Sequence, residues 1–330
     1  MSIAQTLPLS ASGKPPSPRG SGLLSGFAWG VLVCNIAVVL WGAVVRATGS
    51  GAGCGDHWPL CNGVLVQAHP RVATLIELAH RLTSGIAVIG VVVLLVWTFR
   101  STVPRHLARI TSVAATVLIF NEALLGALIV LLGLTANNRS GARAVYLSLH
   151  FANTFLLLGA LALSAHFTSR KPALLRGSVR LAQAPLALLG LGATLAVGVS
   201  GSLAALGDTL FPSRSLMTAL AQDLSAQSSW LLRLRFLHPV AAIVAGIFIC
   251  WLIVRGFSRG SALADRRLGV SVLILLALQY AMGVADVALL APLWLQILHL
   301  LGADLLWVTL VVLTARIFLQ VSPAAQRTAR

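Results

Sequence analysis

Long apolar runs, separated by short polar segments, dominate the chain. Eight of these runs have roughly 20 residues or more, the length that an α-helix needs to cross the hydrocarbon core of a bilayer. They lie at about 24–45, 72–99, 108–134, 144–168, 180–206, 231–254, 267–290 and 293–319. The pattern predicts an all-α membrane protein with eight transmembrane helices.

The basic residues predict the orientation of these helices. Alternate segments between the runs, starting with the N-terminal one, carry 16 Lys and Arg residues, whereas the segments on the other side carry 7. Short loops rich in Lys and Arg stay in the cytoplasm. We therefore expect a multi-pass protein of the cell membrane with both termini in the cytoplasm and residues 46–71 outside.

Three pairs of residues recur along the chain at spacings of 149 to 158 residues. The pairs are His80 with His238, His150 with His299, and Gly126 with Gly283. The end of the first run, 42–51, also weakly resembles the end of the fifth, 198–207. This order indicates an internal duplication. We expect two pseudo-repeated four-helix bundles.

The duplication and the composition of the ends give the domain boundaries. The N-terminal half is expected at 24–168 and the C-terminal half at 180–319, with a cytoplasmic linker at 169–179. Residues 1–23 are rich in Ser, Pro and Gly, a composition typical of disorder, so we expect a disordered cytoplasmic tail. A second cytoplasmic tail is expected at 320–330.

Four histidines lie at similar depths in the predicted helices. Each stands roughly 6–10 residues past the outer end of an even-numbered helix: His80, His150, His238 and His299. Imidazole is a common axial ligand of haem iron, and helical bundles hold cofactors between facing helices. One pair in each half therefore predicts two haem sites. Hydrogen bonding between helices is the alternative role for these side chains.

The second predicted helix carries three ionisable residues within five positions, Glu77, His80 and Arg81. Ionisable groups at membrane depth cost a few kcal/mol each, so a functional role is expected. Glu77 and His80 are three residues apart and share one helix face. The sixth helix keeps the histidine in Phe236-Leu237-His238-Pro239 but lacks the carboxylate.

Composition excludes an ordinary soluble domain, because 58% of the residues are hydrophobic, 10% are charged and the mean hydropathy is +0.91. The net charge of +16 is spread over short loops, so we expect no nucleic-acid partner. Cys54 and Cys61 share one predicted outer loop, where an oxidising compartment would favour a disulfide. Their spacing fits neither c-type haem attachment nor a standard zinc site with His57.

Together these residues resemble the haem A synthase family, the membrane enzymes that convert haem O to haem A. The resemblance covers about 24–319. It rests on Gly42-Ala43-Val44-Val45-Arg46-Ala47-Thr48-Gly49-Ser50-Gly51, on Cys54 and Asp56-His57-Trp58-Pro59-Leu60-Cys61, on Glu77-x-x-His80-Arg81, and on His150, His238-Pro239 and His299.

The resemblance implies a role for each of these residues. Glu77 would be the catalytic acid, His80 and His150 would face the substrate haem O, and His238 and His299 would ligate a resident haem b. The C8 methyl group of haem O would be oxidised to a formyl group by successive hydroxylations, giving haem A for aa3-type terminal oxidases. Haem O synthase, an electron donor of unknown identity and membrane lipid would be its partners.

Several residues keep more than one interpretation. Glu122 stands where the family more often has Gln, and it is either a neutral interhelical contact or part of a proton path. The Cys54–Cys61 pair either stabilises the loop, relays electrons or assists haem transfer. Asp286 and Asp304 are functional candidates only because of the cost of burying them. Four outer arginines would pair with haem propionates or lipid headgroups: Arg46, Arg71, Arg139 and Arg143.

Two other functions compete with haem O oxidation. A dihaem cytochrome b-type protein would pass electrons through both sites without altering either haem. It would have no need of a carboxylate beside one haem only, so Glu77 argues against it. A polytopic transporter with structural histidines would bind no haem.

Overall fold

The computed structural model describes residues 19–64, 68–169, 184–225, 227–257 and 263–318. These residues form nine α-helices and one short 3-10 helix: α1 (Arg19–Ala47), η1 (Ser50–Ala52), α2 (Val72–Ser101), α3 (Leu107–Leu131), α4 (Gly141–Thr168), α5 (Ala184–Leu210), α6 (Leu216–Leu224), α7 (Trp230–Phe257), α8 (Leu263–Ala288) and α9 (Leu293–Phe318). Eight helices of the described ranges, all except α6, are long and apolar enough to cross a membrane. The prediction of an all-α, eight-span membrane protein is confirmed.

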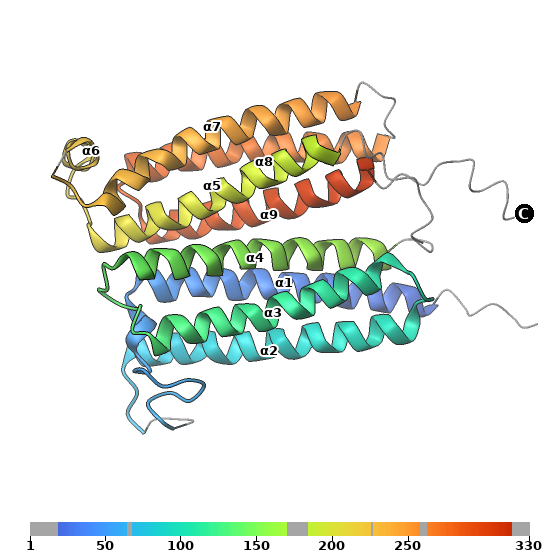
Figure 1. Ribbon diagram of the computed structural model, residues 1–330, viewed down its shortest axis with the longest axis horizontal. Coiled ribbons are helices and arrows are strands. Elements are labelled where there is room, and N and C mark those ends of the chain that lie inside the picture. Colours follow the sequence, from blue (N-terminus) through green and yellow to red (C-terminus); the bar gives the residue numbers. More distant parts are fainter. Residues whose placement is uncertain (1–18, 65–67, 170–183, 226, 258–262, 319–330) are drawn as a thin grey trace, which may run out of the picture.

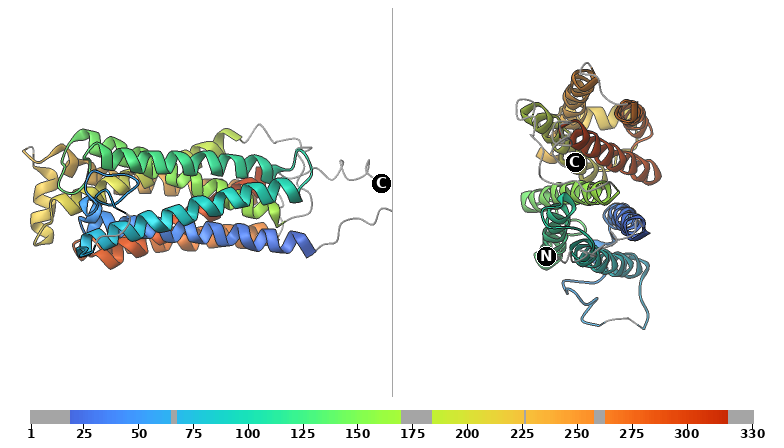
Figure 2. Two further views of the ribbon diagram at one scale, coloured as in Figure 1. Left: turned by 90° about the horizontal axis from the view of Figure 1, so that it is seen from below. Right: turned by 90° about the vertical axis from the view of Figure 1, so that its right-hand side faces the viewer.

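The membrane helices form two groups of four that lie side by side (Figure 1). Helices α1 to α4 make one bundle, and α5, α7, α8 and α9 make the other. The view along the helices shows the same division, with the blue-to-green helices on one side and the orange and red ones on the other (Figure 2). Helix α1 begins and α9 ends at the same end of the molecule, and η1 and α6 lie at the opposite end.

Helices α4 and α9 form the seam between the bundles. About 56% of each apolar span is buried, more than in any other membrane helix of the described chain. The indole N–H of Trp307 on α9 donates to the backbone oxygen of Phe155 on α4, and Gly159 of α4 lies beside the same indole. With no water in the membrane core, close packing and satisfied polar groups hold such a seam together.

Helix α6 is an addition to the predicted elements, since the sequence pattern placed a loop between the apolar runs, at 207–230. Ser215 caps it, because its hydroxyl accepts a hydrogen bond from the backbone N–H of Thr218 at 3.2 Å. The helix has only nine residues, too few to span a bilayer, and hydropathy over a membrane-length window therefore does not find it.

Candidate functional site

The four predicted haem-facing histidines lie near the η1 and α6 end of the molecule. His80 is in α2, His150 in α4, His238 in α7 and His299 in α9, and each stands six to nine residues after the first residue of its helix. At about 1.5 Å per residue, their depths differ by only a few ångströms. Each bundle therefore contributes one pair of imidazoles at one level.

Every one of these imidazoles packs against a glycine of a neighbouring helix. A Cβ atom added to these glycines would lie 2.8 to 3.7 Å from the ring carbon Cε1 of the histidine. The pairs are Gly42 with His80, Gly126 with His150, Gly201 with His238, and Gly283 with His299. The contacts thus align Gly42 with Gly201, a match three residues away from the weak sequence match at Gly198. Because glycine has no side chain, each of these four positions leaves room for a histidine ring.

The C-terminal pair has a separation that suits one iron atom. The ring centres of His238 and His299 lie 6.3 Å apart with perpendicular planes. A metal–imidazole bond is about 2 Å long and a ring nitrogen lies about 1.2 Å from the ring centre, so two imidazoles on opposite sides of one metal ion have centres roughly 6 Å apart. His238 Nδ1 lies 3.2 Å from both the Val197 carbonyl and the Ser200 hydroxyl. The residues present therefore fit a bis-histidine haem.

The N-terminal pair lies on two helices of one bundle, with His80 on α2 and His150 on α4. Nδ1 of His80 is buried and has no hydrogen-bond partner within the described residues. Nδ1 of His150 lies 3.3 Å from a carboxylate oxygen of Glu122. A buried imidazole nitrogen without a partner costs free energy unless a ligand meets the ring. This pair, too, fits a bound haem.

Glu77 of α2 is buried beneath the loop that connects α1 and α2. It is 3% exposed, and its two oxygens have different partners. Oε1 pairs with the Arg81 guanidinium at 2.6 Å, and Oε2 accepts a hydrogen bond from the backbone N–H of Cys54 at 2.8 Å. The carboxylate is thus oriented from both sides, one helical turn outward from His80.

The loop is bound to α2 by further contacts around this carboxylate. Gly53 lies against the backbone of Ala73, where a Cβ atom would come within 2.5 Å, and its carbonyl accepts a hydrogen bond from the Thr74 hydroxyl at 2.7 Å. Arg81 donates to the carbonyls of His57 and Leu60. The loop therefore forms a fixed cover over Glu77.

Cys54 and Cys61 are joined by a disulfide in the structure, and both are buried. The Asn62 backbone N–H donates to the Cys54 carbonyl, which closes the same turn. In the described ranges, no group of three or more His, Cys, Asp and Glu side chains is placed to hold a metal ion. The zinc alternative with His57 thus has no support from the geometry.

The second bundle has an opposite charge at the position that corresponds to Glu77. Arg235 stands three residues before His238 on α7, as Glu77 stands before His80 on α2. Its guanidinium pairs with Asp208 at 2.7 Å and also with Asp223 of α6. Sequence reasoning noticed the missing carboxylate but missed this cation, whose spacing from His238 was the available signal.

Three of the four outer arginines have protein partners. Arg46 reaches across to the other bundle, where it donates to the Ala205 carbonyl and to Gln296. Arg143 donates to the Ala136 and Asn138 carbonyls of its own bundle, and Arg139 lies over the Phe211 ring. These contacts tie loops and bundles together at the outer end.

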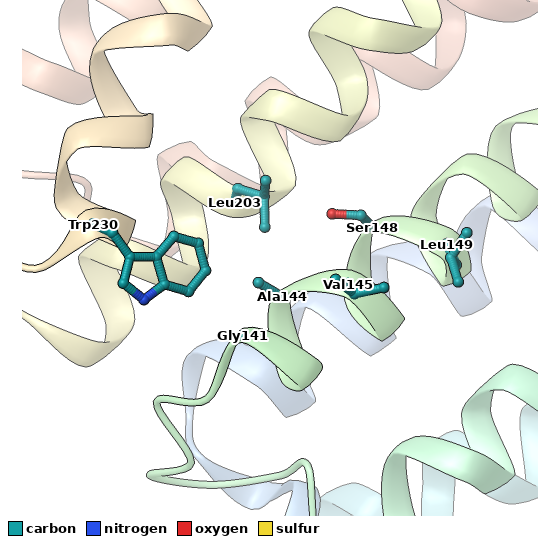
Figure 3. A pocket seen from close by; sticks show the side chains of 7 residues that line it. All are labelled: Gly141, Ala144, Val145, Ser148, Leu149, Leu203 and Trp230. Atoms are coloured by element: carbon teal, nitrogen blue, oxygen red, sulfur yellow. The ribbon is translucent and has the colours of Figure 1, made fainter.

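A separate apolar pocket of about 390 Å³ opens between the two bundles. Figure 3 shows side chains of α4 on one side of it and those of Leu203 on α5 and Trp230 on α7 on the other. Its lining consists of Gly141, Ala144, Val145, Ser148, Leu149, Leu203 and Trp230. None of the four histidines is among these residues, so the pocket is distinct from the imidazole pairs.

A comparison with protein families covers most of the membrane helices. The model of the family described as cytochrome oxidase assembly protein matches residues 25–311. The chain belongs to this family. The match includes Glu77 and all four histidines, so the candidate site lies within the part of the chain that matches the family.

The relatives of this chain include proteins with two different names. A protohaem IX farnesyltransferase of Thermus thermophilus is 46% identical over 292 residues, which are 88% of this chain and 48% of the relative. A haem A synthase of Alkalihalophilus pseudofirmus is 37% identical over 134 residues, 41% of each chain, and that of Geobacillus kaustophilus is 39% identical over 110 residues, 33% of this chain and 35% of the relative. The chain spans about half the length of the Thermus relative.

Proposed function

We propose that this chain is a haem A synthase, which oxidises the C8 methyl group of haem O to a formyl group by successive hydroxylations. Relatives named haem A synthase support this activity, because they are 37% identical over 134 residues and 39% identical over 110 residues. The Thermus relative is about twice as long, so its name describes a protein with much additional sequence. Haem A made in this way would serve aa3-type terminal oxidases.

The difference between the two bundles carries the proposal. Both have an imidazole pair against glycines, but only the N-terminal bundle has a carboxylate, Glu77, one turn outward from its first histidine; the C-terminal bundle has Arg235 there. A passive electron carrier with two equivalent haems gives no reason for this asymmetry. A site that performs chemistry on one haem explains the asymmetry, because proton transfer needs a positioned acid or base.

In this proposal the residues of the chain divide the work between the bundles. His238 and His299 would hold haem b, which stores and passes electrons when bound. His80 and His150 would orient haem O, and Glu77 would exchange protons at its edge or stabilise positive charge there. Arg81 and the Cys54 N–H hold the carboxylate in place, and the loop over it keeps water away.

The location and partners follow from the same assignment. We expect the protein in the cell membrane with both termini in the cytoplasm, which places the Cys54–Cys61 disulfide on the oxidising side. An enzyme that farnesylates protohaem IX, such as the Thermus relative is named to be, would supply haem O. The electron donor is the remaining partner.

Haem extraction tests the function. The chain is expressed in a host that makes haem O but not haem A, and extracted haems are separated by chromatography. We expect haem A with the wild-type chain and only haem O with Glu77→Gln. Haem O alone from a wild-type protein with b-type absorbance would favour the dihaem electron carrier. A purified protein without any haem would favour the transporter.

A second host, which makes protohaem IX but neither haem O nor haem A, tests the other name found among the relatives. We expect no farnesylated haem there. Appearance of haem O would show that this chain is itself a farnesyltransferase and would contradict the proposed activity.

A further inference from the structure

Glu122 of α3 lies directly beside one of the four histidines. Its Oε1 atom is 3.3 Å from Nδ1 of His150, which is ion-pair distance but not yet hydrogen-bond alignment. The same carboxylate accepts hydrogen bonds from the Asn153 amide and the Thr154 hydroxyl, both on α4. Asn121 donates in turn to the Asn153 amide oxygen at 2.8 Å. These donors fix the carboxylate on the Nδ1 side of the ring.

The neighbouring helix leaves the ring little freedom to turn away. Gly126, one turn after Glu122 on α3, lies against Cε1 of His150, where an added Cβ atom would be 3.7 Å away. Cε1 lies between the two ring nitrogens, and Glu122 of the same helix faces Nδ1. Nε2 is therefore the nitrogen that is available to a ligand.

The residue of the second bundle that corresponds to Glu122 is Gln279, and it faces a glycine. Gln279 precedes Gly283 by four residues, as Glu122 precedes Gly126, but its amide points at Gly302 of α9, where an added Cβ atom would lie 2.0 Å from Nε2 of the amide. Nδ1 of His299 has no partner in the part of the chain that the structure describes. His238 meets the neutral Val197 carbonyl and Ser200 hydroxyl. Among the four site histidines, the described part of the chain therefore shows an ion pair with a carboxylate only at His150.

We propose that Glu122 is a positioning residue that polarises His150 toward the iron of the haem substrate. The inference rests on the proposed function, because it takes His150 as a ligand of haem O. Ligating histidines commonly donate their second ring N–H to a carboxylate, which fixes the tautomer and makes the ligand more basic. A more basic ligand stabilises the higher oxidation state of iron. Glu122 therefore lowers the midpoint potential of the haem in the N-terminal bundle.

The test uses purified full-length protein titrated with haem O, with the potential measured by spectroelectrochemistry. Glu122→Gln keeps the size of the side chain and removes its charge. We expect haem O to bind about 10–100-fold more weakly and its midpoint potential to rise. Gln279→Leu, at the matching position of the other bundle, should leave both quantities unchanged. A Glu122→Gln protein with wild-type affinity and wild-type potential would overturn the inference.

A purely structural role for Glu122 predicts a different result, namely a lower melting temperature with an unchanged potential. If Glu122→Gln does not fold, Thr154→Val carries the test, because it removes one donor to the carboxylate and keeps the side-chain volume. Because Thr154 shares Oε1 with His150, its loss leaves more negative charge facing the imidazole, so the potential should fall, and an unshifted potential would overturn the inference.

His150→Ala separates this inference from the proposed function. If His150→Ala binds haem O as the wild type does, the substrate site itself is wrong. If His150→Ala loses binding while Glu122→Gln has no effect on affinity or potential, only the role of Glu122 is wrong.

Discussion

The backbone N–H of Cys54 donates a hydrogen bond to the Glu77 carboxylate at 2.8 Å. This contact joins the disulfide loop to the candidate catalytic residue, so Glu77 has two tasks. It fastens the loop to α2, and in the proposed function it provides the proton-transfer group. Substitutions at Glu77 must therefore be chosen so that the two tasks can be told apart.

We predict that Glu77→Gln abolishes conversion of haem O while the protein keeps its histidine-bound haem. The amide oxygen can still accept from the Cys54 N–H, but the side chain no longer carries a charge for Arg81 or for proton transfer. The measurements are haem chromatography for activity and absorbance of the purified protein for bound haem. Glu77→Ala should in addition destabilise the loop, because a buried N–H then has no acceptor. Normal haem A formation by Glu77→Gln would refute the catalytic assignment.

A second prediction concerns the glycines that support the imidazoles. Gly201→Ala places a Cβ atom 2.8 Å from Cε1 of His238, so the ring must move. We expect a loss of about 1–3 kcal/mol of stability and a smaller haem b signal from the C-terminal bundle. Gly192→Ala, on the same helix with nothing within 4 Å, is the matched control and should be neutral or slightly stabilising. Equal haem content and melting temperature in the two variants would contradict the supporting role of Gly201.

The eight membrane helices were accessible from sequence because hydrophobic length is a strong signal, and most ends agree within a few residues. The exceptions have local causes. The apolar pattern began the seventh span at residue 267, but α8 begins at Leu263. Asp265 lies in the first turn and is buried in a pair with Arg316 of α9 at 2.7 Å. From the sequence alone, Asp265 is assigned to a loop, because the arginine that neutralises it lies on another helix far along the chain.

The candidate site shows the same division between local and distant information. The spacing of Glu77 and His80 predicted one shared helix face. The partner of Glu77 at Cys54 and the partner of His238 at Gly201 depend on how separate helices pack, which spacing along one helix does not contain. The family resemblance supplied residue roles, but the pairing of Glu122 with His150 required coordinates.

Cysteine substitution tests how much the loop depends on its disulfide. We predict that Cys61→Ser lowers the melting temperature without preventing membrane insertion. Thr74 and Glu77 still hold Gly53 and Cys54 on α2, and only the closure of a short loop is lost. Thermal unfolding in detergent and haem content measure the effect. Cys250→Ser, at an exposed position outside the loop, is the control. Complete loss of inserted protein in Cys61→Ser alone would show that the disulfide is required for assembly.

The stability of the protein at mildly acidic pH should depend on His106. This residue lies in the connection between α2 and α3 and caps the N-terminus of α3. Its Nδ1 atom accepts a hydrogen bond from the Ala108 N–H at 3.1 Å, and burial, helped by the charge of Arg109, lowers its pKa below the ordinary value. The folded protein therefore favours the neutral ring and binds fewer protons than the unfolded chain. The stabilisation is complete above the unfolded pKa of about 6.5 and is lost as the pH falls through the lower pKa of the folded state.

His106→Asn isolates this effect, because Asn also caps a helix but does not titrate. Melting temperatures of the two proteins are compared between pH 7.5 and pH 5, so that other titrating groups cancel in the difference. We expect the wild type to lose more stability than the variant over this range. The lowered pKa makes the capping bond pH-dependent only in the wild type. If the melting temperatures of the two proteins fall in parallel as the pH is lowered, His106 keeps its ordinary pKa in the folded protein. Its bond to Ala108 then does not stabilise α3.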